Sequence, residues 1–238
     1  MRKPLTDEEQ NLRLVGNMDR YADWQFEVLS PYISGNVLEI GGGIGTMSSK
    51  IISHPRVSSF SVTEINPKNL YALRKRLGKR CAFFSFDISK GVSRRFLAKF
   101  DTVISANVME HVKDDRAFFR NCCKCLKNGG RIVKLVPALR ANFGSLDRSD
   151  SHYRRYEKQD LSALAAENGL EVLRLFPMNF AGALGWFYHG KVLKKTVHPD
   201  GDLALFNRLI PAIKIAEAAL GVPFGLNLIL VAEKKSGS

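Results

Sequence analysis

The first half of the chain alternates short apolar runs with segments of helical character. The apolar runs have the length of buried strands, and several are followed directly by an acidic or amide residue. The segments between them carry helix signals, such as the N-cap Asn66 before Pro67 and the terminating Gly78. This order is typical of an α/β domain. The expected strands are 37–40, 58–64, 81–86 and 100–106, with a fifth that ends at 137.

Both ends of the chain add predicted helices. Residues 6–15 begin with a capping box, Thr6-x-x-Glu9, and residues 18–29 have apolar positions at helical spacing before Pro31. Pro211 should kink the last helix or split it in two. Further expected elements are a helix at 157–168, a strand at 170–176, a helical insertion at 180–220 and a last strand at 224–232. We therefore expect N-terminal helices in 1–35 and one domain in 36–238.

Composition limits the class of protein. The chain has 238 residues, 45% of them hydrophobic, which is enough for one α/β domain with a sizeable core. No apolar run reaches the ~18 residues of a membrane span, and the N-terminus lacks a signal-peptide apolar region. We expect a cytoplasmic protein, with contact at the inner membrane face as an option.

Charge adds a second limit. The net charge of +13 is spread along the chain rather than held in a tail. A basic excess attracts anionic small molecules, membrane surfaces or nucleic acid. No RNA-recognition or helix-turn-helix signature is present, which disfavours nucleic acid as a partner.

The cysteines do not indicate a metal site or a disulfide framework. Cys122, Cys123 and Cys125 fall in a predicted helix, where successive side chains splay by ~100° and cannot easily converge on one ion. We expect structural thiols there, and we predict no metal in the protein.

A glycine-rich turn follows the first strand. Gly41, Gly43 and Gly45 come directly after Glu39-Ile40, at a strand-to-helix junction where such turns cradle nucleotide-like ligands. Glu64 ends the second strand 23 positions after Gly41, about the interval at which a carboxylate accepts hydrogen bonds from ribose hydroxyls. The turn therefore predicts a site for a nucleoside-containing cofactor.

The ordered motifs E-x-G-x-G-x-G, two strands each ending in an acid, F-D-x-V-x-x-x-N-V-x-E-H and L-K-x-G-G extend over residues 36–137. As a set they resemble the class I S-adenosylmethionine-dependent methyltransferases. The resemblance implies a Rossmann-like, doubly wound seven-stranded sheet, mostly parallel. Its last strand is antiparallel, lies between strands five and six and follows a helical insertion. It also implies S-adenosyl-L-methionine as the cofactor and S-adenosyl-L-homocysteine as the product.

Cofactor contacts are expected at the strand ends. The backbone of Gly41, Gly42 and Gly43 would approach the methionine and ribose, with Glu39 orienting this turn and the amino group. Glu64 would take the ribose hydroxyls, and Asp87 the adenine amino group beside Ile88. Asn107 would meet the methionine end. Two interpretations of helix 18–29 stay open: a core-packing helix, or a lid that places Tyr21 or Trp24 against the sulfonium or adenine.

A second resemblance rests on Gly144-Ser145-Leu146-Asp147, His152-Tyr153-Arg154-Arg155-Tyr156 and Pro223-Phe224-Gly225-Leu226. These segments are similar to a bacterial subfamily of these methyltransferases, some of which occur with glycosyltransferases. That subfamily usually has glycine before the histidine, and this chain has Ser151 instead.

The acceptor site is expected in the loop 138–156 and after the fourth strand. One hypothesis is that Arg154 or Arg155 binds an anionic acceptor while His111 or His152 removes its proton. The alternative is a structural latch that closes the loop over the sheet. The full set of acceptor-side candidates is His111, Asp147, His152, Tyr153, Arg154, Arg155 and Tyr156.

Residues 180–195 also allow two interpretations. They form either a lid against the core or an amphipathic segment that places Trp186, Phe187 and Tyr188 among lipid headgroups, with nearby lysines on anionic lipid. The leading prediction is a methyltransferase acting on an oxygen or nitrogen of a small-molecule or lipid- or glycan-linked acceptor. The alternatives are an RNA methyltransferase and a non-catalytic, cofactor-binding regulatory protein.

Overall fold

A single seven-stranded sheet organises the protein. The computed structural model describes residues 6–7, 10–11, 14 and 18–235, so the predicted capping box at Glu9 lies outside the described residues. The strand order is β3-β2-β1-β4-β5-β7-β6, and β7 is antiparallel to both of its neighbours whereas the other pairs are parallel. This confirms the predicted sheet. The strands are β1 Gly35–Ile40, β2 Val57–Thr63, β3 Ala82–Phe84, β4 Phe100–Ala106, β5 Leu126–Pro137, β6 Leu170–Met178 and β7 Asn227–Lys234.

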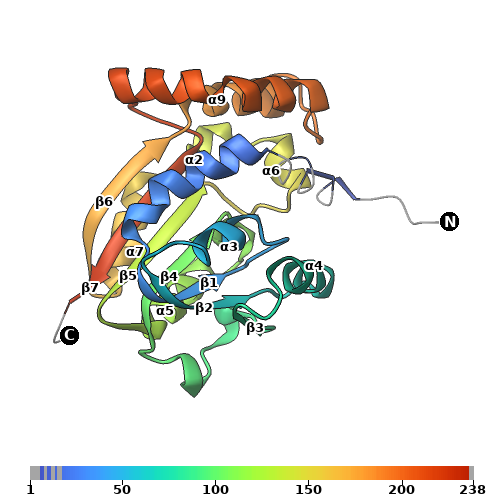
Figure 1. The fold of residues 1–238 in the computed structure, drawn as a ribbon. Helices are drawn as coiled ribbons and strands as arrows, with labels where there is room; N and C mark the ends of the chain where they lie inside the picture. The colour runs from blue at the N-terminus through green and yellow to red at the C-terminus, as the bar shows by residue number, and fades with distance from the viewer. Residues whose placement is uncertain (1–5, 8–9, 12–13, 15–17, 236–238) are drawn as a thin grey trace.

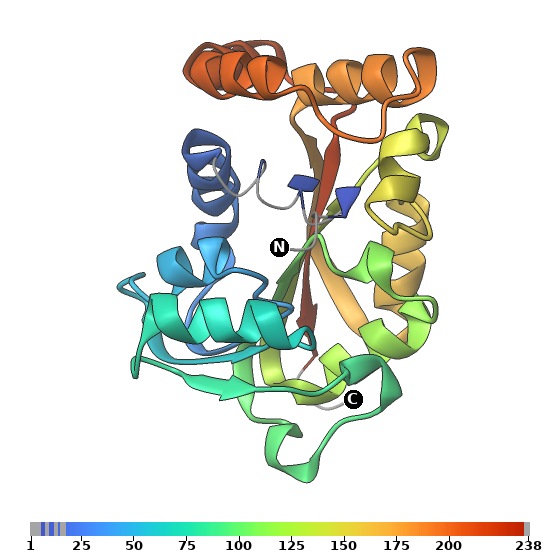
Figure 2. The same cartoon turned by 90° about the vertical axis from the view of Figure 1, so that its right-hand side faces the viewer.

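Helices cover both faces of the sheet (Figures 1 and 2). One face is covered by α2 Asp19–Leu29, α3 Thr46–Ile51 and α4 Pro67–Leu77, and the other by α5 Asp115–Cys125, α6 Ser145–Ser149 and α7 Lys158–Glu167. Two hydrophobic clusters, one on each face, form the core. Above the sheet lie α8 Phe180–Phe187, the π-helical turn Tyr188–Val192 and α9 Asp200–Leu220. None of the described helices combines the length and apolarity that crossing a bilayer requires.

Local signals account for the bounds of α4. The Asn66 side chain accepts hydrogen bonds from the backbone N–H groups of Lys68 and Asn69, Pro67 is the first helical residue, and Gly78 follows the last at φ 63°. On α5, the thiols of Cys122, Cys123 and Cys125 are buried and free, as predicted for structural thiols.

Two expectations about local structure are changed in part. Of the two outcomes expected at Pro211, a kink or a split, the split does not occur, because α9 runs unbroken past this residue. Arg20 of α2 donates a hydrogen bond to the Arg208 carbonyl of α9 at 3.0 Å, which ties the two helices together near the proline. Residues 138–156 are not wholly loop, since they contain α6, a helix too short to leave a periodic pattern.

Candidate functional site

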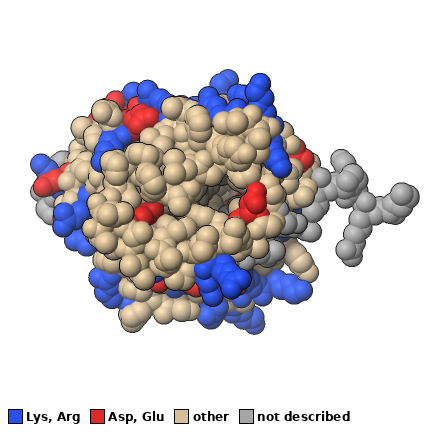
Figure 3. All heavy atoms as spheres, turned by 90° about the horizontal axis from the view of Figure 1, so that it is seen from above, with Lys and Arg blue, Asp and Glu red and all other residues tan. Residues whose placement is uncertain are grey.

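A cavity of about 750 Å³ lies at the carboxyl ends of β1, β2 and β4, beneath α8 and α9. Figure 3 shows a hollow in the upper face of the molecule, bordered mostly by uncharged atoms, with acidic atoms on one side. The carboxyl ends of parallel strands are where ligands bind in open α/β sheets. Both the glycine turn and the acceptor-side histidines line this one cavity.

Several positions of the glycine turn require glycine. Gly41, Gly43 and Gly45 have φ of 76°, 54° and 86°, a region that other residues rarely adopt. A Cβ at Gly42 would stand 2.5 Å from Val62. No heavy atom of the described residues lies within 4 Å of the position of a Cβ at Gly43, so the backbone is open to a ligand there.

Two buried carboxylates support this turn. Glu39 accepts a hydrogen bond from the Ser48 hydroxyl, and burial raises its pKa to about 7 although that hydrogen bond opposes the shift. Glu64 accepts from the Gly43 N–H at 2.7 Å and from the Asn66 N–H at 2.7 Å. Each oxygen of Glu64 keeps a second lone pair, so the carboxylate can still accept from ribose hydroxyls.

The remaining predicted cofactor residues lie at the same end of the sheet, with one exception. Asp87 accepts hydrogen bonds through Oδ1 from the N–H and hydroxyl of Ser89, at 2.9 Å and 2.6 Å, and it lines the cavity beside Ile88. Asn107 adopts φ 52° and also lines the cavity. Trp24 does not line it and is buried in the core, so the structure corrects the prediction of a cofactor contact there.

Tyr21 links the helix α2 to the cavity. Its hydroxyl donates to Asn227 Oδ1 at 2.6 Å, and Asn227 Nδ2 lies 3.3 Å from Asn107 Oδ1. This chain of side chains joins α2, β7 and the end of β4. The helix therefore combines both interpretations, since Trp24 packs in the core and Tyr21 faces the site.

The acceptor side of the cavity is organised around one fully buried carboxylate, Asp147. Its Oδ1 accepts from Arg155 Nε at 2.6 Å and lies 3.0 Å from His152 Nδ1. Its Oδ2 accepts from the Gly144 N–H at 2.9 Å and from Trp186 Nε1 at 3.0 Å. Despite burial, these hydrogen bonds and charges hold the pKa of Asp147 below its usual range.

The arginines of this segment already have partners. Arg155 is buried, donates to the Ala138 carbonyl at 2.9 Å and lies over the Trp186 ring at 4.6 Å. Arg154 lies outside the cavity lining and pairs with Asp115 at 2.8 Å. The Tyr156 hydroxyl, also outside the lining, donates to Asp115 at 3.1 Å. These contacts favour the structural latch over arginine binding of an anionic acceptor, although Nη2 of Arg155 has no hydrogen-bond partner among the described residues.

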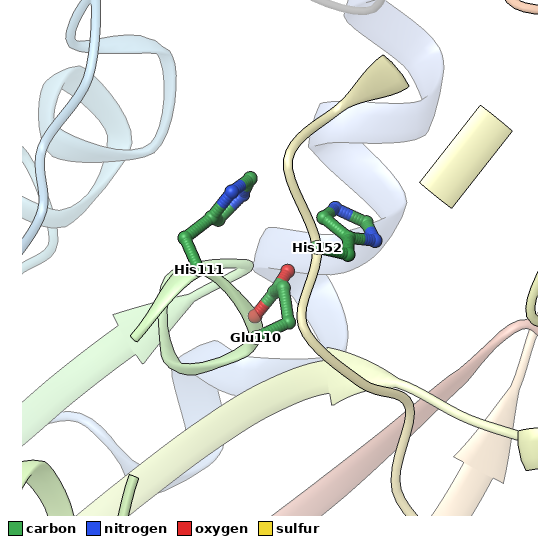
Figure 4. Close-up of side chains that lie close together, drawn as sticks. All are labelled: Glu110, His111 and His152. Carbon is green, nitrogen blue, oxygen red and sulfur yellow. The ribbon is translucent and has the colours of Figure 1, made fainter. Parts of the chain in front are cut away.

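Two histidines and a glutamate lie close together in the wall of the cavity (Figure 4). The rings of His111 and His152 are 4.7 Å apart and nearly perpendicular. Burial and the neighbouring His152 lower the pKa of His111 to about 4. Burial also lowers the pKa of His152, but Asp147 and Glu110 outweigh it and raise that pKa. Tyr153 is mostly exposed, and its backbone N–H donates to the Glu110 carbonyl at 2.8 Å.

Several lining residues escape prediction from the sequence. Glu110 stands within a motif but was assigned no role, and Trp186 points inward rather than toward a membrane. The others are Asn179, His189, His198 and Asn227, which lie after residue 178 and reach the cavity only through the path of α8, α9 and β7. The sequence contains only weak signals for these residues: Asn179 precedes a helix, and His189 stands next to Gly190.

Comparison with known proteins finds sequence similarity to part of this chain. A family described as "Methyltransferase domain" matches residues 38–132. The reducing polyketide synthase Preu2 of Preussia isomera is 27% identical over 111 residues, which cover 44% of this chain. The match spans only 5% of the synthase.

Solved structures extend the likeness over nearly the whole chain. Phosphoethanolamine N-methyltransferase 2 of Haemonchus contortus, in complex with S-adenosyl-L-methionine, superposes with a TM-score of 0.65 at 18% identity, over 97% of this chain and 58% of that one. A SAM-dependent methyltransferase of Archaeoglobus fulgidus gives 0.65 at 14% identity, over 94% and 97%. At these identities the likeness establishes the fold alone.

Proposed function

We propose that this chain, which carries an S-adenosylmethionine-dependent methyltransferase domain of the class I fold, methylates an oxygen or nitrogen of a small-molecule or lipid- or glycan-linked acceptor. The observation that carries the proposal is the single cavity. It joins the glycine turn and strand-end carboxylates to a second, side-chain-lined chamber that contains the imidazoles of His111 and His152. A cofactor-binding regulatory protein needs only the first of these two parts.

The residues present fit the cofactor. Open space at Gly43 admits a ligand against the backbone, and Glu64 and Asp87 end adjacent strands, as a nucleoside requires. When bound, S-adenosylmethionine supplies a sulfonium methyl group. The backbone of Gly41–Gly43 and Asn107 would hold the methionine end, Glu64 the ribose and Asp87 the adenine.

Positioning and water exclusion supply most of the catalysis, because the leaving group is good. The acceptor would lie in the part of the cavity lined by Asn107, His111 and His152. The low pKa of His111 keeps its imidazole neutral near pH 7 but makes it a weak base, so this ring would take the acceptor proton only as the methyl group is transferred. Trp186 and α8 lie over this chamber and limit the entry of water.

An exposed apolar face favours a lipid-linked acceptor. Most of the exposed large apolar side chains among the described residues belong to α8, the π-helical turn and α9, above the cavity. Basic side chains lie around the edge of this face (Figure 3). An interfacial surface combines these two properties. The apolar members are Leu184, Phe187, Tyr188, Val192, Leu193, Leu205, Leu209, Ile215 and Leu220.

Labelled cofactor tests the reaction. The protein is incubated with methyl-labelled S-adenosylmethionine and an extract of its own cells, and label is followed into lipid, aqueous small-molecule, RNA and protein fractions. We expect label in the lipid or small-molecule fraction that is lost with Glu64→Ala. Label confined to RNA would favour the RNA alternative. Cofactor binding without transfer to any fraction would favour the regulatory alternative.

Vesicles test the lipid-linked acceptor separately. Cosedimentation with anionic vesicles at low salt should fall with the double change Phe187→Ser and Leu193→Ser. Leu97→Ser, at an exposed apolar position away from this face, is the matched control and should leave binding unchanged. Equal binding of all three proteins, or no binding of any, would contradict the membrane contact.

A further inference from the structure

Glu110, His111 and His152 form a compact group of ligand-type atoms. One ligand atom from each residue lies within 4.8 Å of the others, and among the described residues this is the one such cluster of histidine, cysteine or acidic side chains (Figure 4). Glu110 and His111 belong to the 3₁₀ turn Met109–His111 after β4, and His152 follows α6. The cluster therefore joins two segments that are distant in sequence and are linked by the hydrogen bond from the Tyr153 N–H to the Glu110 carbonyl.

The Glu110 carboxylate is unusual for a buried acid. Its side chain is fully buried, and among the described residues neither of its oxygens has a hydrogen-bond partner. A buried carboxylate without partners costs several kcal/mol unless it is neutralised or bound to a cation. The group lies beside the cavity rather than in the packed core, so a ligand can reach it.

A second layer of contacts orients the histidines. His152 Nδ1 lies 3.0 Å from Asp147 Oδ1, and because a carboxylate only accepts, this contact places a proton on Nδ1. Nε2 then carries the lone pair. Asp147 is fixed in turn by Arg155 and Trp186. A carboxylate behind a histidine, with its own partners, is the arrangement that orients metal-ligating histidines.

His111 is suited to the same role. The backbone of Asp150 and Ser151 hydrogen-bonds its ring and places it beside Glu110 and His152. The side chain is exposed to the cavity. Ligand atoms around one ion lie about 3–4 Å apart at bond lengths of about 2.0–2.2 Å, so a small rotation of this ring closes the site.

We propose that Glu110, His111 and His152 bind one divalent transition-metal ion, through one carboxylate oxygen and two imidazole nitrogens. Nitrogen and oxygen donors of this kind suit Mn²⁺, Fe²⁺, Co²⁺ or Zn²⁺, and Mg²⁺ prefers an all-oxygen set. Three protein ligands leave positions open toward the cavity. An oxygen of the acceptor would occupy one of them, and this last step rests on the proposed function.

The ion changes the role of His111 within that function. Its lone pair is then used for coordination. The charge of the ion would lower the pKa of a bound acceptor hydroxyl, whose proton would pass to solvent water at the open side of the cavity as the oxygen takes the methyl group. The expectation of a metal-free protein, drawn from the cysteines, is replaced by this site. The competing account is a protonated Glu110 that needs no ion, consistent with burial raising its pKa to about 7.

Direct binding measurements decide between the two. Chelator-treated full-length protein is titrated with Mn²⁺, followed by the electron paramagnetic resonance of the free ion, and with Zn²⁺ by calorimetry. We expect one ion per chain. Affinity should fall at least tenfold in Glu110→Gln and in His111→Asn. His54→Asn, a histidine outside the cavity lining, should bind as the parent does. The His111 variant is informative even if the buried Glu110 change perturbs folding, because His111 is exposed.

Two results would overturn the site: no binding of either ion, or binding of unchanged affinity and stoichiometry in His111→Asn. Failure of the site and failure of the proposed function are separable. If the protein binds one ion per chain but transfers no methyl group, the metal site is supported and the proposed function is contradicted. If chelator-treated protein transfers methyl groups at the full rate, the proposed function is supported and the ion has no part in it. S-adenosyl-L-homocysteine affinity should be the same with and without chelator.

Discussion

The two halves of the cavity are built by different means. The cofactor half consists of a glycine-rich backbone turn and carboxylates at strand ends, all within residues 39–107. The acceptor half consists of side chains from the 3₁₀ turn after β4, from α6 and the segment after it, from α8 and from the segment before α9, and several of them are joined through Asp147. A site made from backbone and strand ends is local in sequence. A site made from interlocked side chains depends on the path of the whole chain.

The largest expected effect on stability comes from a substitution at Asp147, the centre of the acceptor half. Asp147→Asn removes the charge that neutralises buried Arg155, and the free energy of unfolding should fall by about 3–5 kcal/mol, as for other broken buried ion pairs. Chemical denaturation measures this. Asp23→Asn, which breaks the exposed pair with Lys50, should cost less than about 1 kcal/mol. Equal effects of the two changes would show that Asp147 is not the structural centre.

The cofactor half should show a pH-dependent cost at Glu39. The folded pKa is raised from 4.5 to about 7, so the stability contribution is complete below pH 4.5 and is lost as pH rises through 7. The loss amounts to about 3 kcal/mol. Glu39→Gln removes this dependence, and its stability relative to the parent should therefore rise between pH 5 and pH 8. Exposed Glu27→Gln is the control and should show no such change.

A result that would contradict this account is a constant difference between Glu39→Gln and the parent across that pH range. It would mean that Glu39 is ionised in the folded protein throughout, with the Ser48 hydrogen bond outweighing burial.

Cofactor affinity should depend on Glu64 but not on the acceptor half. Hydrogen bonds to a charged group contribute about 1.5–3 kcal/mol each, so Glu64→Ala should weaken S-adenosyl-L-homocysteine binding at least tenfold. Calorimetry measures this. His152→Asn should leave that affinity within about threefold, because it lies across the cavity from the ribose position. Equal losses in both variants would mean that the halves fold as one unit.

The contrast between the two halves also explains which features could be predicted from the sequence. The bounds of α4 and β4 follow from Asn66, Pro67, Gly78 and an uninterrupted apolar run, which are signals within a few residues. The cofactor residues follow strand ends, so a correct strand order places them together. For the cofactor half, the sequence motifs are therefore sufficient to predict which residues line the cavity.

The acceptor half required the structure. Trp186 lies 39 residues after Asp147, and nothing in the sequence between them indicates that the indole donates to that carboxylate. The same segment supports a membrane helix or a lid equally well until its path is known. Arg154 and Arg155 are adjacent, yet one lies at the surface with Asp115 and the other is buried with Asp147. From residue type alone, the two arginines are expected to bind an anionic acceptor. In the folded protein each of them instead pairs with an aspartate that holds the loop in place.

Ser151 offers the smallest and most local test of the acceptor half. It precedes His152 with φ 60°, in the left-handed region that favours glycine. A left-handed residue with a Cβ costs roughly 1–2 kcal/mol, and glycine returns about 0.5–1 kcal/mol of that as added freedom of the unfolded chain. Ser151→Gly should therefore raise the melting temperature by about 2 °C.

Ala98→Gly is the matched control for the cost of the Cβ itself, since Ala98 has φ 52° and lies away from the cavity. Similar gains at both positions would show that the backbone before His152 is strained and that Ser151 is retained at a cost to stability. A gain at Ala98 with a loss at Ser151 would instead mean that contacts of the serine side chain outweigh the strain. The acceptor half would then depend on a side chain even at a position whose backbone conformation favours glycine.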